Sequence, residues 1–298
     1  MRKRMTLLAV VAVAALALAG CSGSDSGTTG STDAGSTPTA PFEVATDVAL
    51  TGSPTFDAMT ERGSVKVGVK EDQPGLGYLD AATGERTGFD IDIARWIAAS
   101  LGFSEDKIEF VAIPSANREA AIVNGDIDYY VGTYSITDKR KEQIDFAGPY
   151  FVTGQGLLVA ADNSDITSEK DLAGKTVCSA TGSTPIQNIR DNFPDTKTVE
   201  FDTYSQCVDA LKDGSVDAVT TDAAILIGYA AQEPDVLKVV GEPFTVENYG
   251  VGLPKGDDAL RTFINEMFTN GGETWTAIYD ATLGQSGTSV EQPAVDQY

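Results

Sequence analysis

Strand-like and helix-like patterns of apolar positions alternate along most of the chain. Residues 65–69 alternate with a period of two, which predicts a strand followed by a Pro-Gly-rich loop. The apolar residues of 89–101 fall on one helical face, which predicts a helix that Asp90 caps and Gly102 ends. Because similar pairs recur to the end, the pattern predicts an α/β protein with largely parallel sheets, whose ligand sites lie beyond the carboxyl ends of strands.

Two segments of the chain follow one plan, position for position. Residues 122–128 and 211–217 each indicate a helix end, a glycine stop, and a strand that opens with an apolar residue and Asp. Thr133 and Asp222 stand at the same distance past these segments, so both are expected at the carboxyl ends of equivalent strands. We interpret the repeat as two similar lobes, with chance recurrence of a common βα pattern as the alternative.

The first residues of the chain have the features of an export signal. A basic start is followed by an apolar run over residues 7–19 and by small residues ahead of Cys21. The run is shorter than the roughly 20 residues of a membrane span, and small residues before a cysteine resemble the lipobox of bacterial lipoproteins. The pattern predicts a signal peptide over 1–20 and a lipid on Cys21, which would anchor the protein at the extracytoplasmic face of the cell membrane. An uncleaved anchor with an incidental cysteine is the alternative.

The segment after Cys21 differs in composition from the rest of the chain. Residues 22–40 are rich in Ser, Thr and Gly and hold no large apolar side chain, so they cannot pack into a core. We therefore expect a flexible tether over residues 21–56 before the folded body.

Charge and composition exclude several classes of function. The 298 residues carry 21 Lys and Arg against 44 Asp and Glu, a net charge of -23, which disfavours nucleic acid as a partner and argues weakly for a monomer. The chain has no histidine, which excludes Ser-His-Asp and Cys-His nucleophile systems and HExxH zinc sites. We expect no catalytic residues, no cofactor and no metal.

The densest polar stretch covers residues 132–140, which leave a predicted strand and enter a helix that Thr137 or Ser135 can cap. Hydroxyl groups, backbone N–H groups and the guanidinium of Arg140 suit a carboxylate, because the planar fork can bind both of its oxygens. The alternative is a solvated helix in which Arg140 pairs with Asp138 or Glu142.

A second stretch with this chemistry is Thr181-Gly182-Ser183-Thr184-Pro185, which follows a predicted strand. Glycine permits close backbone approach, Ser183 or Thr184 can cap, and Pro185 suits the first helical turn, so the N–H groups of the helix start can hold an anion. The stretch lacks the lysine of a phosphate-binding P-loop. An ordinary capped helix is the alternative.

Cys178 and Cys207 are the only cysteines beyond Cys21. An exported protein folds in an oxidising setting, so a disulfide between them is expected, with two buried free thiols as the alternative. The bond would close a loop of about 30 residues and add about 3 kcal/mol of stability on the chain-entropy argument.

These stretches together resemble the extracytoplasmic solute-binding proteins of polar amino-acid ABC transporters, over roughly residues 60–285. The matching segments occur in order along the chain: 88–94, 117–118, 125–128, 137–140, 145–150, 171–175, 182–184 and 214–219. The resemblance implies a two-lobed periplasmic-binding-protein fold of type II, with an amino acid bound between the lobes. It also implies a two-stranded hinge near residues 152–154 and 249–251. Lobe one is then expected over 57–153 and 250–298, and lobe two over 154–249.

The resemblance also implies a role for individual residues. Arg140 corresponds to the residue that binds the α-carboxylate, with Thr133 and Ser135 as hydrogen-bonding partners in lobe one. Thr184, beside Gly182, corresponds to a carboxylate donor of lobe two. Asp222 corresponds to the acceptor of the α-ammonium.

One position departs from the family and helps to indicate the ligand. Many relatives have an aromatic residue over the ligand where this chain has Gln73. Segments 70–77 and 133–137 are most similar to glutamate-binding lipoproteins of Gram-positive actinobacteria, which implies L-glutamate as the ligand.

The charge of glutamate supplies a partly independent argument. A buried ligand with two carboxylates and one ammonium needs about two cations and one anion around it. Lys70 stands where relatives place a residue that contacts the ligand side chain, so we expect Lys70 to bind the γ-carboxylate. The alternatives are a surface lysine paired with Glu71 or Asp72, and Arg118 as the second cation.

We therefore expect a non-enzymatic, substrate-binding lipoprotein that captures glutamate and delivers it to a membrane-embedded ABC permease. One alternative is a ligand-sensing subunit of a signalling receptor. The other is an enzyme similar to cyclohexadienyl dehydratase on the same fold, but no carboxylate pair stands out by position as its general acid.

Overall fold

The computed structural model describes residues 42–286 and 290–298. The predicted signal peptide and Cys21 lie outside the described residues. Contacts divide the chain into the units Met1–Gly35 and Ser36–Tyr298, and everything below concerns the second unit. Within the part of the chain that is described, no helix combines the length and the apolar composition needed to cross a bilayer.

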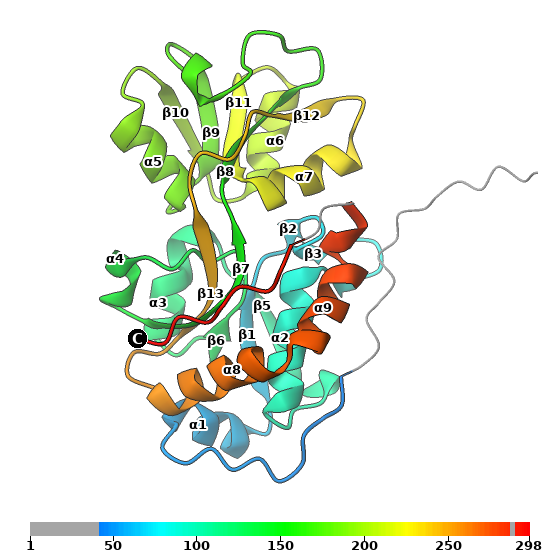
Figure 1. Cartoon of the computed structure of the whole chain (residues 1–298), viewed down its shortest axis with the longest axis vertical. Helices are drawn as coiled ribbons and strands as arrows, with labels where there is room; N and C mark the ends of the chain where they lie inside the picture. The colour runs from blue at the N-terminus through cyan, green and yellow to red at the C-terminus, as the bar shows by residue number, and fades with distance from the viewer. Residues whose placement is uncertain (1–41, 287–289) are drawn as a thin grey trace, which may run out of the picture. The chain divides into compact units, whose positions relative to one another are not determined.

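Two five-stranded sheets with the same plan organise this unit (Figure 1). The first has the order β5 (Ile108–Ala112), β1 (Val65–Val69), β6 (Tyr129–Tyr130), β13 (Glu247–Leu253), β7 (Asp145–Thr153). The second has the order β10 (Lys197–Phe201), β9 (Thr176–Ala180), β11 (Ala218–Asp222), β8 (Gln155–Ala160), β12 (Leu237–Val240). In both sheets the first three strands are parallel, and the last two pair antiparallel. The predicted pair of similar α/β lobes is confirmed, but the sheets are mixed rather than largely parallel, because each contains two parallel and two antiparallel strand pairs.

We call the first sheet with its helices lobe 1 and the second sheet with its helices lobe 2. The helices of lobe 1 are α1 (Pro54–Arg62), α2 (Phe89–Ser100), α3 (Arg118–Val123), α4 (Asp138–Lys141), α8 (Asp258–Asn270) and α9 (Gly272–Ala281). The helices of lobe 2 are α5 (Thr184–Asn192), α6 (Tyr204–Lys212) and α7 (Ala223–Gln232). A small sheet of β2 (Asp72–Gln73), β3 (Gly77–Leu79) and β4 (Arg86–Thr87) follows β1.

The internal repeat of the sequence leads into the third strand of each sheet. Gly125 after α3 and Gly214 after α6 have φ angles of 71° and 78°, a left-handed conformation that glycine adopts without a steric penalty. Asp222 is the last residue of β11, and Thr133 lies shortly after β6. Both residues therefore emerge at the carboxyl ends of equivalent strands, as predicted.

Strand β1 and helix α2 form where the pattern predicts them, but the cap of α2 differs. Gly88 is the N-cap and supplies no side-chain hydrogen bond. A Cβ at Gly88 would lie 2.2 Å from the carbonyl oxygen of Leu76, so only glycine fits there. The predicted cap by Asp90 is wrong, because this carboxylate is buried inside the first turn and binds Thr133 and Tyr150 instead.

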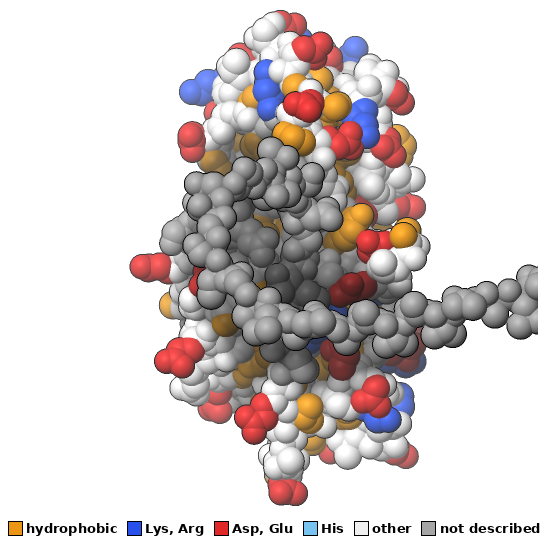
Figure 2. Space-filling view, turned by 90° about the vertical axis from the view of Figure 1, so that its right-hand side faces the viewer, with side chains coloured by type: hydrophobic (Ala, Val, Ile, Leu, Met, Phe, Trp, Pro, Cys, Tyr) orange, Lys and Arg blue, Asp and Glu red, His pale blue; other side chains and the backbone are white. Residues whose placement is uncertain are grey.

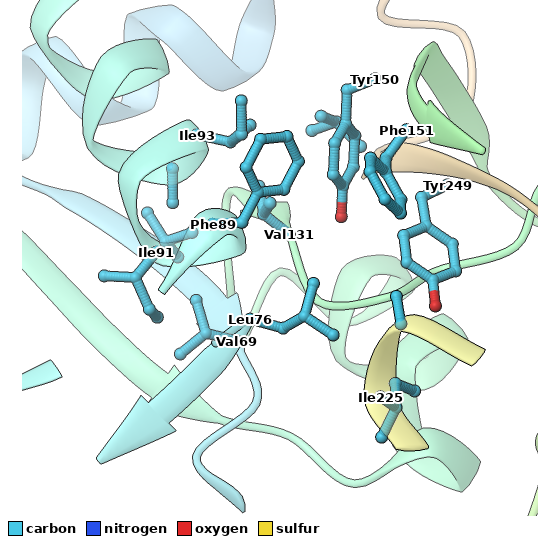
Figure 3. Packing of buried hydrophobic residues seen from close by; sticks show 14 of the residues in the cluster. Val69, Leu76, Phe89, Ile91, Ile93, Val131, Tyr150, Phe151, Ile225 and Tyr249 are labelled. Carbon is cyan, nitrogen blue, oxygen red and sulfur yellow. The ribbon is translucent and has the colours of Figure 1, made fainter. Parts of the chain in front are cut away.

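Aromatic side chains fill lobe 1 where β7 and β13 leave it (Figure 3). The ring centres of Phe89 and Phe151 lie 5.4 Å apart, and those of Phe151 and Tyr249 lie 5.8 Å apart. The hydroxyl of Tyr249 points toward the start of α7 and donates to Asp222 Oδ2 over 2.7 Å. The rings bury a large apolar area, and they connect the core of lobe 1 directly to a polar residue of lobe 2.

The chain passes between the lobes twice, at neighbouring points. Strand β7 ends at Thr153 and β8 begins at Gln155, while the return passage precedes Glu247 at the start of β13. Glu247 pairs with Thr153, so the two passages lie side by side (Figure 1). A Cβ at Gly154 would lie 2.3 Å from the carbonyl oxygen of Thr245, which explains glycine at this point.

Cys178 of β9 and Cys207 of α6 form the predicted disulfide, with their Cα atoms 5.5 Å apart. The alternative of two free thiols is wrong. Both cysteines belong to lobe 2 and are fully buried, so the bond fastens α6 to its own sheet and leaves the passages between the lobes free.

The folded body begins earlier than expected. Phe42, Val48 and Leu50 pack against the core of lobe 1, and the N–H of Ala45 donates to the carbonyl oxygen of Ala99 over 2.9 Å. The tether expected through residue 56 is therefore too long, because these apolar side chains follow neither a strand nor a helix period and give no sequence signal of packing.

Candidate functional site

Arg140 lies at the centre of the contacts between the lobes and is 7% exposed. Its Nε forms an ion pair with Glu119 Oε1 over 3.2 Å. Its Nη1 donates to the carbonyl oxygen of Ser135 over 2.7 Å, and its Nη2 donates to that of Gly182 in lobe 2 over 3.1 Å. A guanidinium carries five N–H donors, so these bonds leave donors for a further oxygen ligand.

The local structure around Arg140 follows the prediction only in part. Thr137 caps α4, since its Oγ1 accepts from the N–H of Arg140 over 3.2 Å. The alternative of a solvated helix is wrong, because the guanidinium is buried and its acidic partner is Glu119 rather than Asp138 or Glu142.

Two further buried cations, Lys70 and Arg118, lie near Arg140. The Cζ atoms of Arg118 and Arg140 lie 4.2 Å and 4.9 Å from the centre of the Tyr134 ring. Arg118 donates from Nε to the carbonyl oxygen of Ser115 over 3.1 Å and from Nη1 to that of Thr133 over 3.3 Å. Arg118 therefore orients backbone at the site and adds positive charge to it.

Lys70 follows β1 and is 5% exposed. Its Nζ donates to Ser115 Oγ over 2.8 Å, and none of the ion pairs among the described residues includes it. Burial, and then the charge of Arg118, lower the pKa of Lys70 to about 7. The alternative of a surface lysine paired with Glu71 or Asp72 is wrong. A buried ammonium of this kind is stabilised by any anion that reaches it.

Gln73 is fully buried and donates from Nε2 to Thr133 Oγ1 over 3.1 Å. Thr133 has a φ of 46°, which is a strained, left-handed conformation for a β-branched residue. Asp90 Oδ2 accepts from the N–H of Thr133 over 2.9 Å, and Asp90 Oδ1 accepts from the hydroxyl of Tyr150 over 2.8 Å. Asp90 thus holds Thr133 in place, and burial raises the pKa of Asp90 to about 6.

Asp222 is the acidic residue of lobe 2 at the site and is 3% exposed. Its Oδ2 accepts from Tyr249, whereas its buried Oδ1 has no hydrogen-bond partner within the described ranges. Burial, and then the negative charge of Glu247, raise the pKa of Asp222 to about 7, while Tyr249, Arg118 and Arg140 oppose this rise. Unpartnered buried carboxylate oxygens are costly, so this atom favours a proton or a cationic donor beside it.

Helix α5 begins at the site with the predicted cap. Ser183 Oγ accepts from the N–H of Ile186 over 3.4 Å. The hydroxyl of Thr184 donates to Glu247 Oε2 over 2.9 Å and lies 3.3 Å from Ser135 Oγ in lobe 1. A carboxylate of the chain itself therefore lies beside the helix start, where the sequence predicts an anion.

Gly182 allows the lobes to approach each other at this point. Its φ is 76°, and a Cβ there would lie 2.8 Å from the Cα of Ala116 in lobe 1. A second approach brings Gly228 of α7 against Pro74, where a Cβ would lie 2.2 Å from the proline carbonyl oxygen. The structure therefore has the two lobes in direct contact around the charged residues.

The structure brings the predicted ligand-binding residues into one network, in which the Tyr134 ring, in contact with both Arg118 and Arg140, joins two hydrogen-bonded groups. The network contains Lys70, Gln73, Thr133, Ser135, Arg140, Gly182, Thr184 and Asp222. Their roles toward a ligand remain predictions. Sequence reasoning missed Glu119, Ser115 and Glu247, because each reaches the network through a contact with a residue remote in sequence. Across the described ranges, no group of three or more His, Cys, Asp or Glu residues is arranged to hold a metal.

The charges at the site contrast with those of the surface. The chain has a net charge of -23, and acidic side chains are spread over both ends of the face in Figure 2 rather than gathered in one patch. The buried site instead places three cations, Lys70, Arg118 and Arg140, and the buried Asp90 on the lobe 1 side, and Asp222 on the lobe 2 side. Such a separation of charge suits a small ligand that carries both signs.

Two α/β lobes, two adjacent passages between them and a buried, two-signed set of charges at their contact define a two-lobed ligand-binding protein. The chain belongs to the bacterial extracellular solute-binding proteins, family 3, whose profile matches residues 65–285. The family and the fold implied by the sequence resemblance are thus confirmed.

The chain is similar to proteins named for amino-acid binding. It is 42% identical to the glutamate-binding protein GluB of Corynebacterium glutamicum over 255 residues, which are 81% of this chain and 85% of that protein. It is 44% identical to a glutamine-binding protein of Geobacillus stearothermophilus over 205 residues, 68% of this chain and 78% of that protein. The crystal structure of a cysteine-binding protein from Campylobacter jejuni has a TM-score of 0.74 and 31% identity, covering 81% of this chain and 98% of that one.

Proposed function

We propose that this protein captures L-glutamate between its two lobes and delivers it to the membrane-embedded permease of an ABC importer. One observation carries the proposal. Among the described residues, the buried Lys70 of lobe 1 has no acidic partner in an ion pair and Oδ1 of the buried Asp222 of lobe 2 has no hydrogen-bond donor, and the charge of Arg140 acts on both groups. Glutamate supplies the complementary group for each.

Each charged group of the ligand has a partner of opposite charge in this arrangement. The α-carboxylate binds the remaining donors of Arg140, together with the N–H groups at the start of α5. The α-ammonium binds Asp222 Oδ1, and the γ-carboxylate binds Lys70. Because the partners come from both lobes, the bound amino acid stabilises the closed form and shifts the population toward it.

The names of the relatives support an acidic ligand or its amide. The two relatives described above are named for glutamate and for glutamine, which differ only in the side-chain carboxylate. Lys70 favours glutamate, because a buried ammonium is stabilised more by a carboxylate than by a neutral amide. Gln73 stands where many relatives have an aromatic residue, and its polar amide is compatible with a ligand that has a polar side chain.

Isothermal titration calorimetry of the purified protein against the common amino acids tests the proposal. We expect L-glutamate to bind tightest, glutamine and aspartate more weakly, and basic amino acids not at all, because a basic side chain would face Lys70. The absence of heat with glutamate, aspartate and glutamine alike would contradict the ligand assignment.

Glutamate binding should depend on pH in a bell-shaped manner centred near neutrality. Asp222, with a pKa of about 7, must lose its proton to bind the ammonium, so the affinity falls as the pH drops below this value. Lys70, also with a pKa of about 7, must be protonated to bind the γ-carboxylate, so the affinity falls again at higher pH. Each limb approaches about tenfold per pH unit.

Calorimetry between about pH 5 and pH 9 measures both limbs. Glutamine is the matched control, because it lacks the γ-carboxylate and its affinity should show the acidic limb alone. An affinity for glutamate that stays constant across this range would count against the roles of both residues.

We also propose that the protein is a monomeric lipoprotein held at the extracytoplasmic face of the cell membrane by a lipid on Cys21. The export pattern over residues 1–20 and the small residues ahead of the cysteine support this. The family name places its members outside the cell, and a net charge of -23 opposes self-association.

We infer that the site binds its ligand without catalysis. The buried carboxylates with raised pKa values, Asp90 and Asp222, hold Thr133, Tyr150 and Tyr249. Among the described residues, neither carboxylate shares a hydrogen bond with a second acid or a base in the manner of a general acid–base couple, although the charge of Glu247 acts on Asp222. The relatives described above are likewise named for binding.

A further inference from the structure

Asp72 is the first residue of β2, in the small sheet of lobe 1, and its carboxylate binds lobe 2. It is half-buried, and its Oδ2 accepts from the N–H of Ser205 in α6 over 3.1 Å. The hydroxyl of Tyr229 in α7 donates to the carbonyl oxygen of Asp72 and lies 3.3 Å from Oδ2. None of the ion pairs among the described residues includes Asp72. Because a hydroxyl has one proton, the backbone N–H of Ser205 is the donor on which the carboxylate depends.

The start of α6 offers this N–H to lobe 1. Ser205 is the second residue of a helix of 9 residues, and the first N–H groups of a helix have no partner within it. The N-cap residue Thr203 accepts from the N–H of Gln206 over 3.4 Å, so lobe 2 itself supplies the acceptor for that group. The acceptor for Ser205 comes from lobe 1, and the positive end of the helix dipole favours its negative charge.

The residues that follow Asp72 connect this contact to the predicted ligand site. Gln73 is fully buried and binds Thr133 in the network described above. The carbonyl oxygen of Pro74 lies so close to Gly228 of α7 that a Cβ there would be 2.2 Å from it. Strand β2 thus lies against α6 and α7 (Figure 1), with Asp72 and Pro74 on lobe 2 and Gln73 in the network between them.

The disulfide gives the contact a hold on more than one helix. Cys207 belongs to α6 and is bonded to Cys178 in β9, a strand of the lobe 2 sheet. Because this bond fastens α6 to the sheet, an interaction at the start of α6 acts on lobe 2 as a whole.

We propose that Asp72 is a positioning residue that holds the lobes together around the amino acid, without contacting it, by accepting a hydrogen bond from the start of α6. The inference rests on the proposed function, in which the ligand is bound between the lobes. Opening of the lobes would separate Asp72 from Ser205, so loss of the carboxylate should speed ligand release and leave capture unchanged. A half-buried hydrogen bond at a helix start implies an effect of about fivefold.

The test is stopped-flow measurement of L-glutamate association and dissociation with the purified full chain. Asp72→Ala should raise the dissociation rate about fivefold, with an association rate within about twofold of wild type. Asp72→Asn should have an intermediate effect, because a neutral amide oxygen accepts more weakly. Asp80→Ala is the matched control, since the Asp80 carboxylate accepts from the N–H groups of Ala82 and Thr83 in its own loop. An unchanged dissociation rate in a folded Asp72→Ala protein would overturn the proposal.

Glutamine separates this contact from an effect on Lys70. The negative charge of Asp72 opposes the lowering of the Lys70 pKa, so its loss could weaken the binding of a γ-carboxylate, which only glutamate has. A contact that holds the lobes together acts on any enclosed amino acid, so release of glutamate and glutamine should speed by the same factor. Faster release of glutamate alone would assign the effect to Lys70 and contradict the proposal.

Amide hydrogen exchange, followed by NMR, reports on the hydrogen bond itself. With glutamate bound, the N–H of Ser205 should exchange faster in Asp72→Ala than in wild type. The N–H of Gln206, which Thr203 accepts within lobe 2, should be unchanged. If the wild-type protein does not bind glutamate, the proposed function fails, and the same comparison without ligand then decides about Asp72. Equal exchange of Ser205 in the variant and the wild type would refute its role.

Discussion

The Arg140→Ala variant is expected to lose binding of every amino acid, with affinities reduced by about a thousandfold. The α-carboxylate is common to all amino acids, and the loss of the guanidinium leaves this group buried without a charged partner. The same substitution removes the bond to the carbonyl oxygen of Gly182, so it also weakens the contact between the lobes. Calorimetry with glutamate, glutamine and aspartate measures the effect.

Two further variants make the Arg140 result specific. Arg140→Lys keeps the charge but lacks the planar fork, so it should bind with intermediate affinity. Arg95→Ala removes a lobe 1 arginine that pairs with Asp92 and Glu105 away from the site, and it should leave binding unchanged. Near-normal binding by a folded Arg140→Ala protein, with folding checked by circular dichroism, would refute the proposed arrangement of the ligand.

The second large effect is a change of specificity. Lys70→Met should weaken glutamate binding about a hundredfold and change glutamine binding little, because only glutamate has a carboxylate at this position. Lys66→Met, four positions earlier within β1 and outside the network, is the matched control. Equal losses for glutamate and glutamine would show that Lys70 does not contact the ligand side chain.

The same variant should be more stable than the wild type. Burial lowers the pKa of Lys70 from 10.5 to about 7, so the charged form opposes folding. This penalty is complete below the lowered value, decreases as the pH rises toward 10.5, and is absent above it. Thermal unfolding at neutral pH should therefore give a higher Tm for Lys70→Met, and a lower Tm would show that Lys70 stabilises the fold.

Much of the fold could be predicted from the sequence, because the patterns that indicate each element span only a few neighbouring residues. The period-two run of β1, the amphipathic face of α2 and the glycines after α3 and α6 each report on a few neighbouring residues. The repeat over residues 122–128 and 211–217 extended this local information to the equivalence of two sheets. Residues 42–50 lacked any such period, and so their packing on lobe 1 was not predicted.

The site could be predicted only in part, because many of its contacts join residues that are distant in the sequence. Arg140 and Asp222 were recognised from residue chemistry combined with family resemblance. By contrast, Glu119 meets Arg140 across 21 positions, and Glu247 meets Thr184 across 63. No propensity or motif records which acidic residue a distant hydroxyl or guanidinium will meet. Asp90 illustrates the same point, since a helix-start carboxylate looks like a cap until its partners Thr133 and Tyr150 are known.

The adjacent passages at Thr153 and Glu247 have a mechanical consequence. Among the described residues, two adjacent backbone segments connect the lobes, so a bend in both segments would rotate one lobe relative to the other, and the disulfide lies within lobe 2, away from these segments. A small bend in these two backbone segments then moves the edges of the lobes farthest from them by a larger distance. A permease that contacts only those edges can therefore distinguish the ligand-bound form from the ligand-free form without contacting the amino acid.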